Sequence, residues 1–346
     1  LGEGLASANK EYLEKLDATL LVFQEGTGYS TIESRLDYQK VKRVQRVEGV
    51  ANAGPIGFSN VEIVLDDGLD PIGVSFIGTE TGKPGLPAPI IGETIRSKQS
   101  KVVMIDERIA ESANISVGDY ITIKSTQGAE DKFYDLRVTG ITDGQQYFFQ
   151  PSIFVSLAIW DKYRPKADAS VSSSRPVTNV IAVELDDPTA MISMASIIES
   201  VVKDVETTDI KTAYESAPGY SAQQSTLNTM KGFTFLIGVL VIGGFFQIQT
   251  LQKVPQIGML KAIGTPNAVV AVASILQIIF VTVFGVALGG LAVFGLVLGM
   301  PSSVPILFTG TSVLIAVASL LLIGPLGGLV SIRVALKVEP LTALGM

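Results

Sequence analysis

Three long runs without a single charged residue constrain this chain most. They are 233–250, 268–299 and 306–332, and Phe, Ile, Val, Leu and Gly dominate them. A helix needs about 20 mostly apolar residues to cross the hydrocarbon core of a bilayer. Buried helices of soluble proteins rarely stay uncharged over such lengths. We therefore predict an all-α membrane domain of three transmembrane helices, over 233–251, 268–299 and 306–332.

The middle run is long enough to raise the question of two spans. At about 1.5 Å per residue it exceeds one bilayer as a straight helix, but two spans and a turn would not fit. A single long helix is the better interpretation. Gly289-Gly290 is the candidate point for a break, ahead of Pro301.

The few cations of the apolar half set its orientation. Lys253 and Lys261 lie between the first two runs, Arg333 and Lys337 follow the third, and 300–305 carries no cation. Cytoplasmic loops are the ones enriched in Lys and Arg. We therefore place 252–267 and the tail 333–346 in the cytoplasm, and the first 230 residues outside.

The beginning of the chain agrees with an additional preceding span. An odd number of spans requires one if the N-terminus of the protein is cytoplasmic. Leu1-Gly2-Glu3-Gly4 has neither the basic nor the apolar region of a signal peptide, so another segment would have to deliver the front half across the membrane.

The front half has the composition of a water-exposed domain. Residues 1–230 hold 21 cations and 32 anions, a net charge of −11, whereas the remainder has a net charge of +4. Short alternating or apolar runs between turn residues predict strands. Amphipathic patterns over 36–47 and 188–205 predict helices. The sequence thus predicts an extracytoplasmic α+β domain over 1–214 and a helical stalk over 215–232; the expected strands are 18–24, 61–65, 73–77, 102–105, 120–124, 136–142 and 179–184.

Composition also limits the chemistry. The chain contains no His and no Cys, which removes imidazole and thiolate as catalytic groups and metal ligands. We expect no catalytic, cofactor-binding or metal site. The segment 78–84, GTETGKP, is similar to a phosphate-binding loop, but it is one residue short and Pro follows its Lys. Asp66, Asp67 and Asp70 lack the ligand spacing of a calcium loop, and a solvated hairpin tip is favoured.

Aromatic residues gather near Pro151. Tyr147, Phe148 and Phe149, together with Trp160, predict a core cluster, with contact to a partner or a lipidic substrate as the alternative.

The segment between the first two spans has the pattern of a short helix. Pro255 suits a first turn, and Gly264 with Pro266 suits an end. Val254, Ile257, Leu260 and Ile263 or Gly264 recur at helical spacing, so one face is apolar. An amphipathic helix parallel to the membrane would be a docking element, and a simple solvated turn is the alternative.

Small residues recur four apart in the middle span. Gly285 with Gly289, and Gly295 with Gly299, would let helices approach closely within a chain or across a dimer. General glycine enrichment of membrane helices is the alternative. Pro325 is expected to kink the third span.

Two segments resemble the FtsX-like, MacB-type permease family of ABC transporters. Residues 257–264, IGMLKAIG, are similar to the family's pattern of Glu-Ile-Gly, two apolar residues, a basic residue and Ala-Leu-Gly. Residues 333–344, RVALKVEPLTAL, resemble its closing segment, in which an acidic residue and Pro precede Ala-Leu. Residues 1–4 resemble the junction after the family's first span.

The resemblance implies a MacB-like periplasmic core domain and a coupling helix that docks on a cytoplasmic ABC ATPase, which would bind the ATP. Gln256 stands where the family usually has an acid, and its basic cluster is reduced to Lys253, so the contact is expected to be more apolar here. The residues expected to form this contact are Val254, Gln256, Ile257, Gly258, Leu260, Lys261, Ala262, Ile263 and Gly264.

The expected function is the permease subunit of an exporter or mechanotransmission complex in a bacterial cell membrane. Charge-free spans argue against a proton-coupled carrier and favour an amphiphilic substrate such as a lipid, lipoprotein, peptide or drug-like molecule. Expected partners are the ATPase, a second permease subunit, membrane lipid and a periplasmic adaptor or membrane-fusion protein, but not nucleic acid. One alternative is a signalling protein that regulates an outer partner, such as a cell-wall hydrolase, without transport. Another is an anchored receptor without an ATPase.

Overall fold

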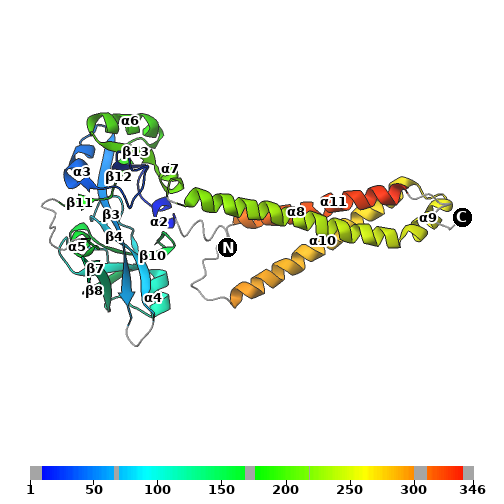
Figure 1. The fold of residues 1–346 in the computed structure, drawn as a ribbon, viewed down its shortest axis with the longest axis horizontal. Helices are drawn as coiled ribbons and strands as arrows, with labels where there is room; N and C mark the ends of the chain where they lie inside the picture. Colours follow the sequence, from blue (N-terminus) through cyan, green and yellow to red (C-terminus); the bar gives the residue numbers. More distant parts are fainter. Residues whose placement is uncertain (1–9, 66–69, 168–175, 218, 300–309, 338–346) are drawn as a thin grey trace. The chain divides into compact units, whose positions relative to one another are not determined.

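A computed structural model describes residues 10–65, 70–167, 176–217, 219–299 and 310–337 (Figure 1). The chain divides into two compact units, Leu1–Gln223 and Gln224–Met346. The first is a mixed α and β domain, and the second is built from long apolar helices.

Thirteen described strands and several short helices build the first unit. The strands are β1 Leu20–Gln24, β2 Leu36–Asp37, β3 Val50–Val64, β4 Ile72–Thr79, β5 Pro89–Gly92, β6 Val102–Asp106, β7 Tyr120–Gln127, β8 Glu130–Thr142, β9 Gln146–Tyr147, β10 Gln150–Ser156, β11 Val177–Thr178, β12 Val180–Leu185 and β13 Val205–Asp209. The helices are α2 Glu11–Glu14, α3 Tyr38–Val44, α4 Glu107–Ala113, α5 Leu157–Tyr163, the 3-10 turn Pro188–Ala190, α6 Met191–Val201 and α7 Ile210–Glu215.

Six of the strands close into a ring. The main sheet has the order β13-β1-β12-β3-β4-β10-β6-β8-β5, and β7 joins β3 to β8. Following these pairings from β3 through β4, β10, β6, β8 and β7 leads back to β3. Among the described pairs only β10 with β4 and β6 with β8 are parallel. The ring therefore has the pairing of a small, mostly antiparallel barrel.

Three cores hold the domain together. One fills the barrel with inward side chains of its six strands, closed by α4 and α5. A second lies between α3, α6 and the strands β1, β12 and β13, the lobe with α6 at the top of Figure 1. A third packs α2 and α7 against the other face of β1, β3, β4 and β10. The alternation of buried and exposed residues along β7 shows why such strands are recognisable from sequence.

Trp160 explains two glycines of the barrel. A Cβ at Gly57 or Gly78 would overlap the Trp160 side chain, so only glycine leaves room for the indole. Trp160 is buried, and its Nε1 donates a hydrogen bond of 3.0 Å to Oγ of Ser59. Gly78 thus lies in strand β4, and the chain continues through a turn to β5 rather than into a helix. This is not the strand-to-helix geometry of a phosphate loop.

The predicted aromatic cluster divides between two cores. Tyr147 and Phe148 contribute to the core under α2, whereas Trp160 fills the barrel. Phe149 is largely exposed. The prediction of a single cluster was therefore wrong. Strand β10 lies between Phe149 and Trp160 in the chain, and the residues before and after it pack into different cores. Asp66 and Asp67 lie outside the described residues.

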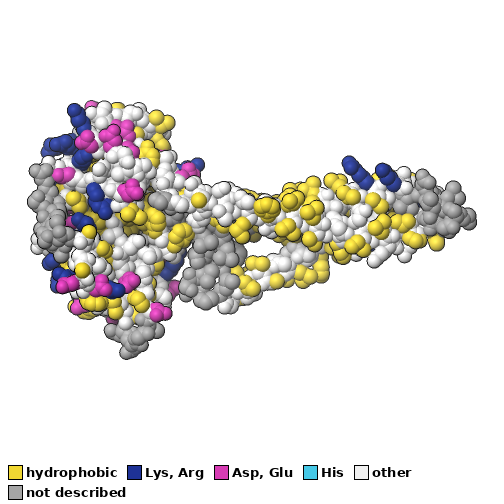
Figure 2. All heavy atoms as spheres, viewed as in Figure 1, with side chains coloured by type: hydrophobic (Ala, Val, Ile, Leu, Met, Phe, Trp, Pro, Cys, Tyr) yellow, Lys and Arg dark blue, Asp and Glu magenta, His cyan; other side chains and the backbone are white. Residues whose placement is uncertain are grey.

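The second unit contains three long apolar helices and one short one. They are α8 Tyr220–Gln252, α9 Val254–Ala262, α10 Asn267–Leu298 and α11 Gly310–Lys337. Within the described residues, three helices are long and apolar enough to cross a membrane. α10 is a single helix that continues through Gly289-Gly290, and α8 runs without interruption through 220–252. Figure 2 shows hydrophobic side chains along these helices.

Glycines set the close crossings of these helices. A Cβ on Gly243 would lie 2.9 Å from the carbonyl oxygen of Gly327, and a Cβ on Gly327 would lie 2.8 Å from the amide nitrogen of Gly243. A Cβ on Gly324 would overlap Thr282, and one on Gly328 would overlap Ile278. α11 therefore meets α8 and α10 with its backbone close to theirs, the arrangement small residues permit in membranes.

Candidate coupling helix and its attachment to the spans

The candidate site is α9, which links two membrane-spanning helices. Pro255 lies in its first turn, where the missing N–H costs no hydrogen bond. At its end Gly264 has a φ of +95°, its N–H bonds the carbonyl of Lys261 at 3.0 Å, and the N–H of Thr265 bonds that of Leu260 at 3.1 Å. This pair of bonds is the Schellman motif, which ends a helix at a glycine.

One face of α9 packs onto the unit. Val254, Ile257 and Lys261 are half-buried and Gly258 is buried. They recur at spacings of three and four, so they lie on one side of the helix. Glycine at 258 is the smallest residue on this packed face.

The other face leaves large apolar side chains uncovered. Met259 is 59 %, Leu260 48 % and Ile263 77 % exposed. Gln256, Ala262 and Gly264 are exposed as well. The apolar positions expected to form a single stripe therefore divide between two faces. Met259 joins the uncovered set although the helical pattern did not single it out; its spacing of four from Ile263 is the signal that could have found it.

Hydrogen bonds tie α9 and its preceding residue to two spans. Lys261 Nζ donates to the backbone oxygen of Leu336 in α11 at 2.8 Å. Lys253 Nζ donates to Oε1 of Gln277 in α10 at 3.2 Å. Figure 2 shows Lys and Arg side chains gathered toward this end of the unit. These two hydrogen bonds link α9 to α11 and the residue before α9 to α10.

Amide and hydroxyl side chains extend this polar network between the spans. Gln277 Nε2 donates to Oε1 of Gln249 in α8 at 2.8 Å. Thr250 Oγ1 in α8 donates to Oγ of Ser331 in α11 at 3.1 Å. One helical turn earlier Oε1 of Gln247 is buried, and no described group forms a hydrogen bond with it. Buried polar groups in apolar surroundings hold helices in a defined register.

The remaining predicted site residues, Gly285 and Gly289, lie on an open side of α10. Nothing in the described part of the chain comes within 4 Å of a Cβ built on either. The close crossings within this unit use Gly243, Gly324 and Gly327 instead. That Gly285 and Gly289 pack against a second chain stays a prediction. Pro325 lies inside α11.

Comparison with known families covers both units. Residues 1–201 match the model of the MacB-like periplasmic core domain, and residues 228–340 match that of the FtsX-like permease C-terminal region. The chain belongs to the FtsX-like, MacB-type permease family of ABC transporters. It is a multi-pass membrane protein with a large extracytoplasmic domain, and as an ABC permease it is the membrane subunit that works with a cytoplasmic ATPase.

Two similar proteins are named as transport permeases. The chain is 26% identical over 345 residues to the putative hemin transport system permease protein HrtB of Staphylococcus haemolyticus, an alignment that spans 100% of this chain and 90% of that protein. A protein of the same name from Staphylococcus epidermidis is 29% identical over 144 residues, which is 42% of this chain and 41% of that protein.

The comparison with solved structures finds matches of low sequence identity. The periplasmic region of MacB from Actinobacillus actinomycetemcomitans is 15% identical with a TM-score of 0.39, covering 57% of this chain and 91% of that one. The extracellular domain of the ABC-type transporter YknZ from Gram-positive bacteria is 10% identical with a TM-score of 0.39, covering 55% of this chain and 99% of that one.

Proposed function

We propose that this chain is the permease subunit of an ABC-type exporter in which a cytoplasmic ATPase docks on α9. The observation that carries the proposal is the uncovered apolar surface of Met259, Leu260 and Ile263 on a helix whose other face is fixed to the spans. A few well-packed residues near the centre of an interface supply most of its binding energy. The chain needs no cofactor of its own, since the partner binds the ATP.

The proposed mechanism transmits motion rather than opening a polar pore. ATP-driven closure of the ATPase would move α9, and Lys261 and Lys253 would carry this displacement to α11 and α10. The backbone contact of Gly243 with Gly327 leaves little space for the helices to yield at their crossing. A second permease subunit would complete the complex, and an outer adaptor could receive the motion.

The proposed substrate is a planar amphiphile of the hemin type. The relatives named as hemin permeases support this class. The stretch of α10 and the part of α11 before Arg333 contain no charged side chain, which suits an apolar molecule better than an ion. The chain has no His or Cys, so the common imidazole and thiolate ligands of haem iron are absent. Recognition would therefore rest on apolar contact with the porphyrin rather than on those iron ligands.

Leu260→Asp tests the docking surface, with Leu260→Met as the matched control. A carboxylate at the centre of an apolar contact is expected to lower ATPase stimulation about tenfold or more, since an unpaired charge would be buried on docking. The permease is co-expressed with its ATPase and assayed in nanodiscs for hydrolysis, and in inside-out vesicles for hemin movement. Ile257→Asp serves as a second comparison, because Ile257 is half-buried in the helix packing and its loss should disturb the unit itself.

The outcomes separate the alternatives. Loss of both activities in Leu260→Asp with retention in Leu260→Met supports docking and transport. Normal ATPase stimulation in Leu260→Asp would overturn the docking assignment. ATPase stimulation that depends on Leu260 without any hemin movement would indicate the signalling function or another substrate.

A further inference from the structure

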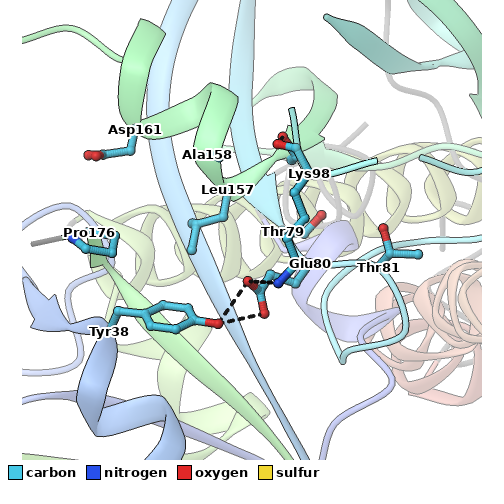
Figure 3. Close-up of a pocket in the computed structure, with 10 residues that line it drawn as sticks. Tyr38, Thr79, Glu80, Thr81, Lys98, Leu157, Ala158, Asp161 and Pro176 are labelled. Atoms are coloured by element: carbon cyan, nitrogen blue, oxygen red, sulfur yellow. Dashed lines mark hydrogen bonds and ion pairs between the residues drawn. The ribbon is translucent and has the colours of Figure 1, made fainter. Parts of the chain in front are cut away.

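A cavity of about 390 Å³ opens in the first unit beside the segment 78–84, well separated in sequence from α9. It lies between the end of β4 and its following loop, the start of α3 and the start of α5 (Figure 3). Figure 3 shows side chains from all three elements turned toward one space. Tyr38, Thr79, Glu80, Lys98, Leu157 and Asp161 are among the residues that line it.

Glu80 is the fixed charge of this cavity. The Tyr38 hydroxyl lies 2.9 Å from Oε1 and 3.0 Å from Oε2 of its carboxylate and donates to it. Burial and the neighbouring Glu80 raise the pKa of Tyr38 to about 12, so the hydroxyl stays protonated at neutral pH. The Glu80 side chain is 14% exposed, which leaves it reachable but held in one orientation.

Lys98 forms a weak ion pair with the Glu80 carboxylate. Its Nζ lies 3.4 Å from Oε1 of Glu80, and the Lys98 side chain is 76% exposed. An exposed lysine at that distance gains little from the pair and gives up rotamer freedom to make it. Figure 3 shows it lying along the wall of the cavity and ending at Glu80. An external ammonium group can therefore take its place.

Thr79 supplies an unused hydrogen-bonding group on the same wall. Thr79 is 2% exposed, and its Oγ1 is buried with no hydrogen-bond partner among the residues that the structure describes. The neighbouring hydroxyls are satisfied: Ser156 Oγ donates to the carbonyl of Lys98 at 2.6 Å, and Thr81 Oγ1 donates to that of Ile95. Buried polar groups are normally paired, so this one needs an explanation. Because Thr79 lines the same cavity as Glu80 and Lys98, we assign its oxygen as the acceptor for a second N–H of a ligand bound there.

The remaining walls favour a cation with an apolar body. Leu157, Ala158 and Pro176 add apolar surface. Asp161 adds a second carboxylate, itself paired with Nε of Arg164 at 3.0 Å. The first 230 residues have a net charge of −11, which raises the local concentration of cations.

We propose that this cavity binds a small organic cation, an ammonium group on an apolar body, whose nitrogen replaces Lys98 at Glu80 and donates to Thr79. The site is additional to the export function proposed above and does not depend on it. The rival is a carboxylate or phosphate ligand held by Lys98, and substitution of Lys98 changes the two affinities in opposite directions.

The test uses two fluorinated probes of the same size and opposite charge. 4-Fluorophenethylamine and 4-fluorophenylacetate are titrated against the full chain in nanodiscs of zwitterionic lipid, and binding is followed by ¹⁹F NMR. Probe partition into the bilayer is subtracted with empty nanodiscs. The wild type is compared with Glu80→Gln, Thr79→Val and Lys98→Ala. Lys124→Ala is the control, since Lys124 forms its ion pairs with Glu62 and Asp131 elsewhere in the domain.

We expect the amine to bind and the acid not to bind. Glu80→Gln should weaken amine binding about tenfold or more, because a charge-assisted hydrogen bond is replaced by a neutral one. Thr79→Val should weaken it about fivefold through the loss of one hydrogen bond. Lys98→Ala should strengthen it about threefold or more, because the competing ammonium is gone. Lys124→Ala should leave it unchanged.

Three results would overturn the proposal. Amine binding that is equal in the wild type and in Glu80→Gln would place the probe elsewhere. Acid binding lost in Lys98→Ala would make the cavity an anion site. No binding of the amine to Lys98→Ala, an exposed substitution that should leave the fold intact, would mean that the cavity takes no ammonium. Failure of hemin transport bears on none of these results, so the two proposals fail separately.

Discussion

The ammonium group of Lys261 in α9 donates a 2.8 Å hydrogen bond to the backbone oxygen of Leu336 in the last turn of α11. The last four carbonyls of a helix have no partner within it, so a lysine from another helix is a favourable donor there. The contact connects the short helix α9 directly to the end of a membrane-spanning helix.

Lys261→Met is predicted to loosen α9 from α11 while keeping the length of the side chain. Loss of a charged hydrogen bond of about 1.5–3 kcal/mol should raise amide exchange in 254–263 about tenfold or more, as far as local opening limits exchange. Hydrogen exchange with mass spectrometry on the full chain measures this. Lys253→Met is the control, since Lys253 bonds the Gln277 side chain, and it should affect 254–263 less. Equal protection in wild type and Lys261→Met would contradict the tether.

Gly327→Ala is predicted to destabilise the crossing of α8 and α11. An added Cβ would lie 2.8 Å from the Gly243 nitrogen and 2.8 Å from the Val239 oxygen, so the two backbones would have to separate. Overpacking of this kind costs about 1–3 kcal/mol. The midpoint of thermal unfolding in detergent should fall accordingly.

Gly289→Ala is the matched control in α10. Its Cβ meets nothing within 4 Å in the described chain, so the monomer should tolerate it. If Gly289→Ala lowers the yield of cross-linked dimer while leaving unfolding unchanged, Gly289 packs against a second copy. An unfolding midpoint for Gly327→Ala equal to that of the wild type would rule out the close crossing.

Gly78→Ala is predicted to destabilise the barrel because its methyl group would overlap the Trp160 side chain. The expected loss is about 2–3 kcal/mol, near the upper range for overpacking a rigid core. Trp160 is the single tryptophan of the chain, so its fluorescence reports unfolding of this domain within the full protein.

Gly82→Ala provides the comparison in the same segment. Gly82 has a φ of +73° with open space around its Cβ position, so alanine there costs only the left-handed conformation, about 1 kcal/mol. A larger effect at Gly82 than at Gly78 would contradict the role given to Trp160.

Asp106 is predicted to make the domain less stable as the pH rises from about 4 to about 6. Burial raises the pKa of its carboxyl to about 6, although the backbone N–H groups of Gln145 and Arg108 donate to it. Between the unfolded pKa of 3.8 and the folded pKa, the native state binds the extra proton, so stability contributed by the protonated form is lost as the pH rises. The size of the effect is about 3 kcal/mol.

Asp106→Asn removes this titration and keeps the cap of α4, because Asn caps helices as well as Asp. Denaturant unfolding followed by Trp160 fluorescence is compared for the two proteins at pH 4 and pH 7. The free energy of unfolding of the variant should increase relative to that of the wild type as the pH rises. A difference that stays constant across this range would exclude Asp106 as the titrating group.

The apolar spans were predictable because their signal is dense and local. A run of about twenty uncharged, apolar residues is typical of a membrane-spanning helix. The helix α10, Asn267–Leu298, agrees with the predicted run 268–299 within one residue at each end. The caps of α9 were visible too, since Pro255 and Gly264 act through their own backbones. Which residues of α9 are buried was not predictable, because contacts with other helices, such as that of Lys261 with α11, decide it.

The first half of β3 shows why part of the outer domain escaped prediction. Gly54-Pro55 and Gly57 have the composition of a turn, yet all three lie in the sheet. Gly54 and Pro55 pair with β12, with Pro55 opposite Ile181, and Gly57 pairs with Gly78 of β4. Position 57 requires glycine because any larger residue would overlap Trp160, which lies about a hundred residues later in the chain. The segment 150–156 was not predicted as a strand for a similar reason. Pro151 argues against a central strand, yet this segment forms β10, which lies between β4 and β6 in the sheet. The cavity around Glu80 depends on three elements that are distant in sequence. The segment 78–84 stood out in the sequence only for its likeness to a phosphate loop, which does not indicate this cavity.

β3 has a mechanical consequence for the outer domain. Its first residues pair with β12 in one lobe, and its later residues pair with β4 and β7 in the barrel, along one unbroken backbone of 15 residues. A hinge between the lobes would have to bend this continuous strand between Ile56, where the ladder to β12 ends, and Gly57, where the ladder to β4 begins. It would also have to open the core that α2 and α7 form with the strands of both lobes. The domain should therefore respond to a load as one stiff lever, tilting as a whole with little internal strain.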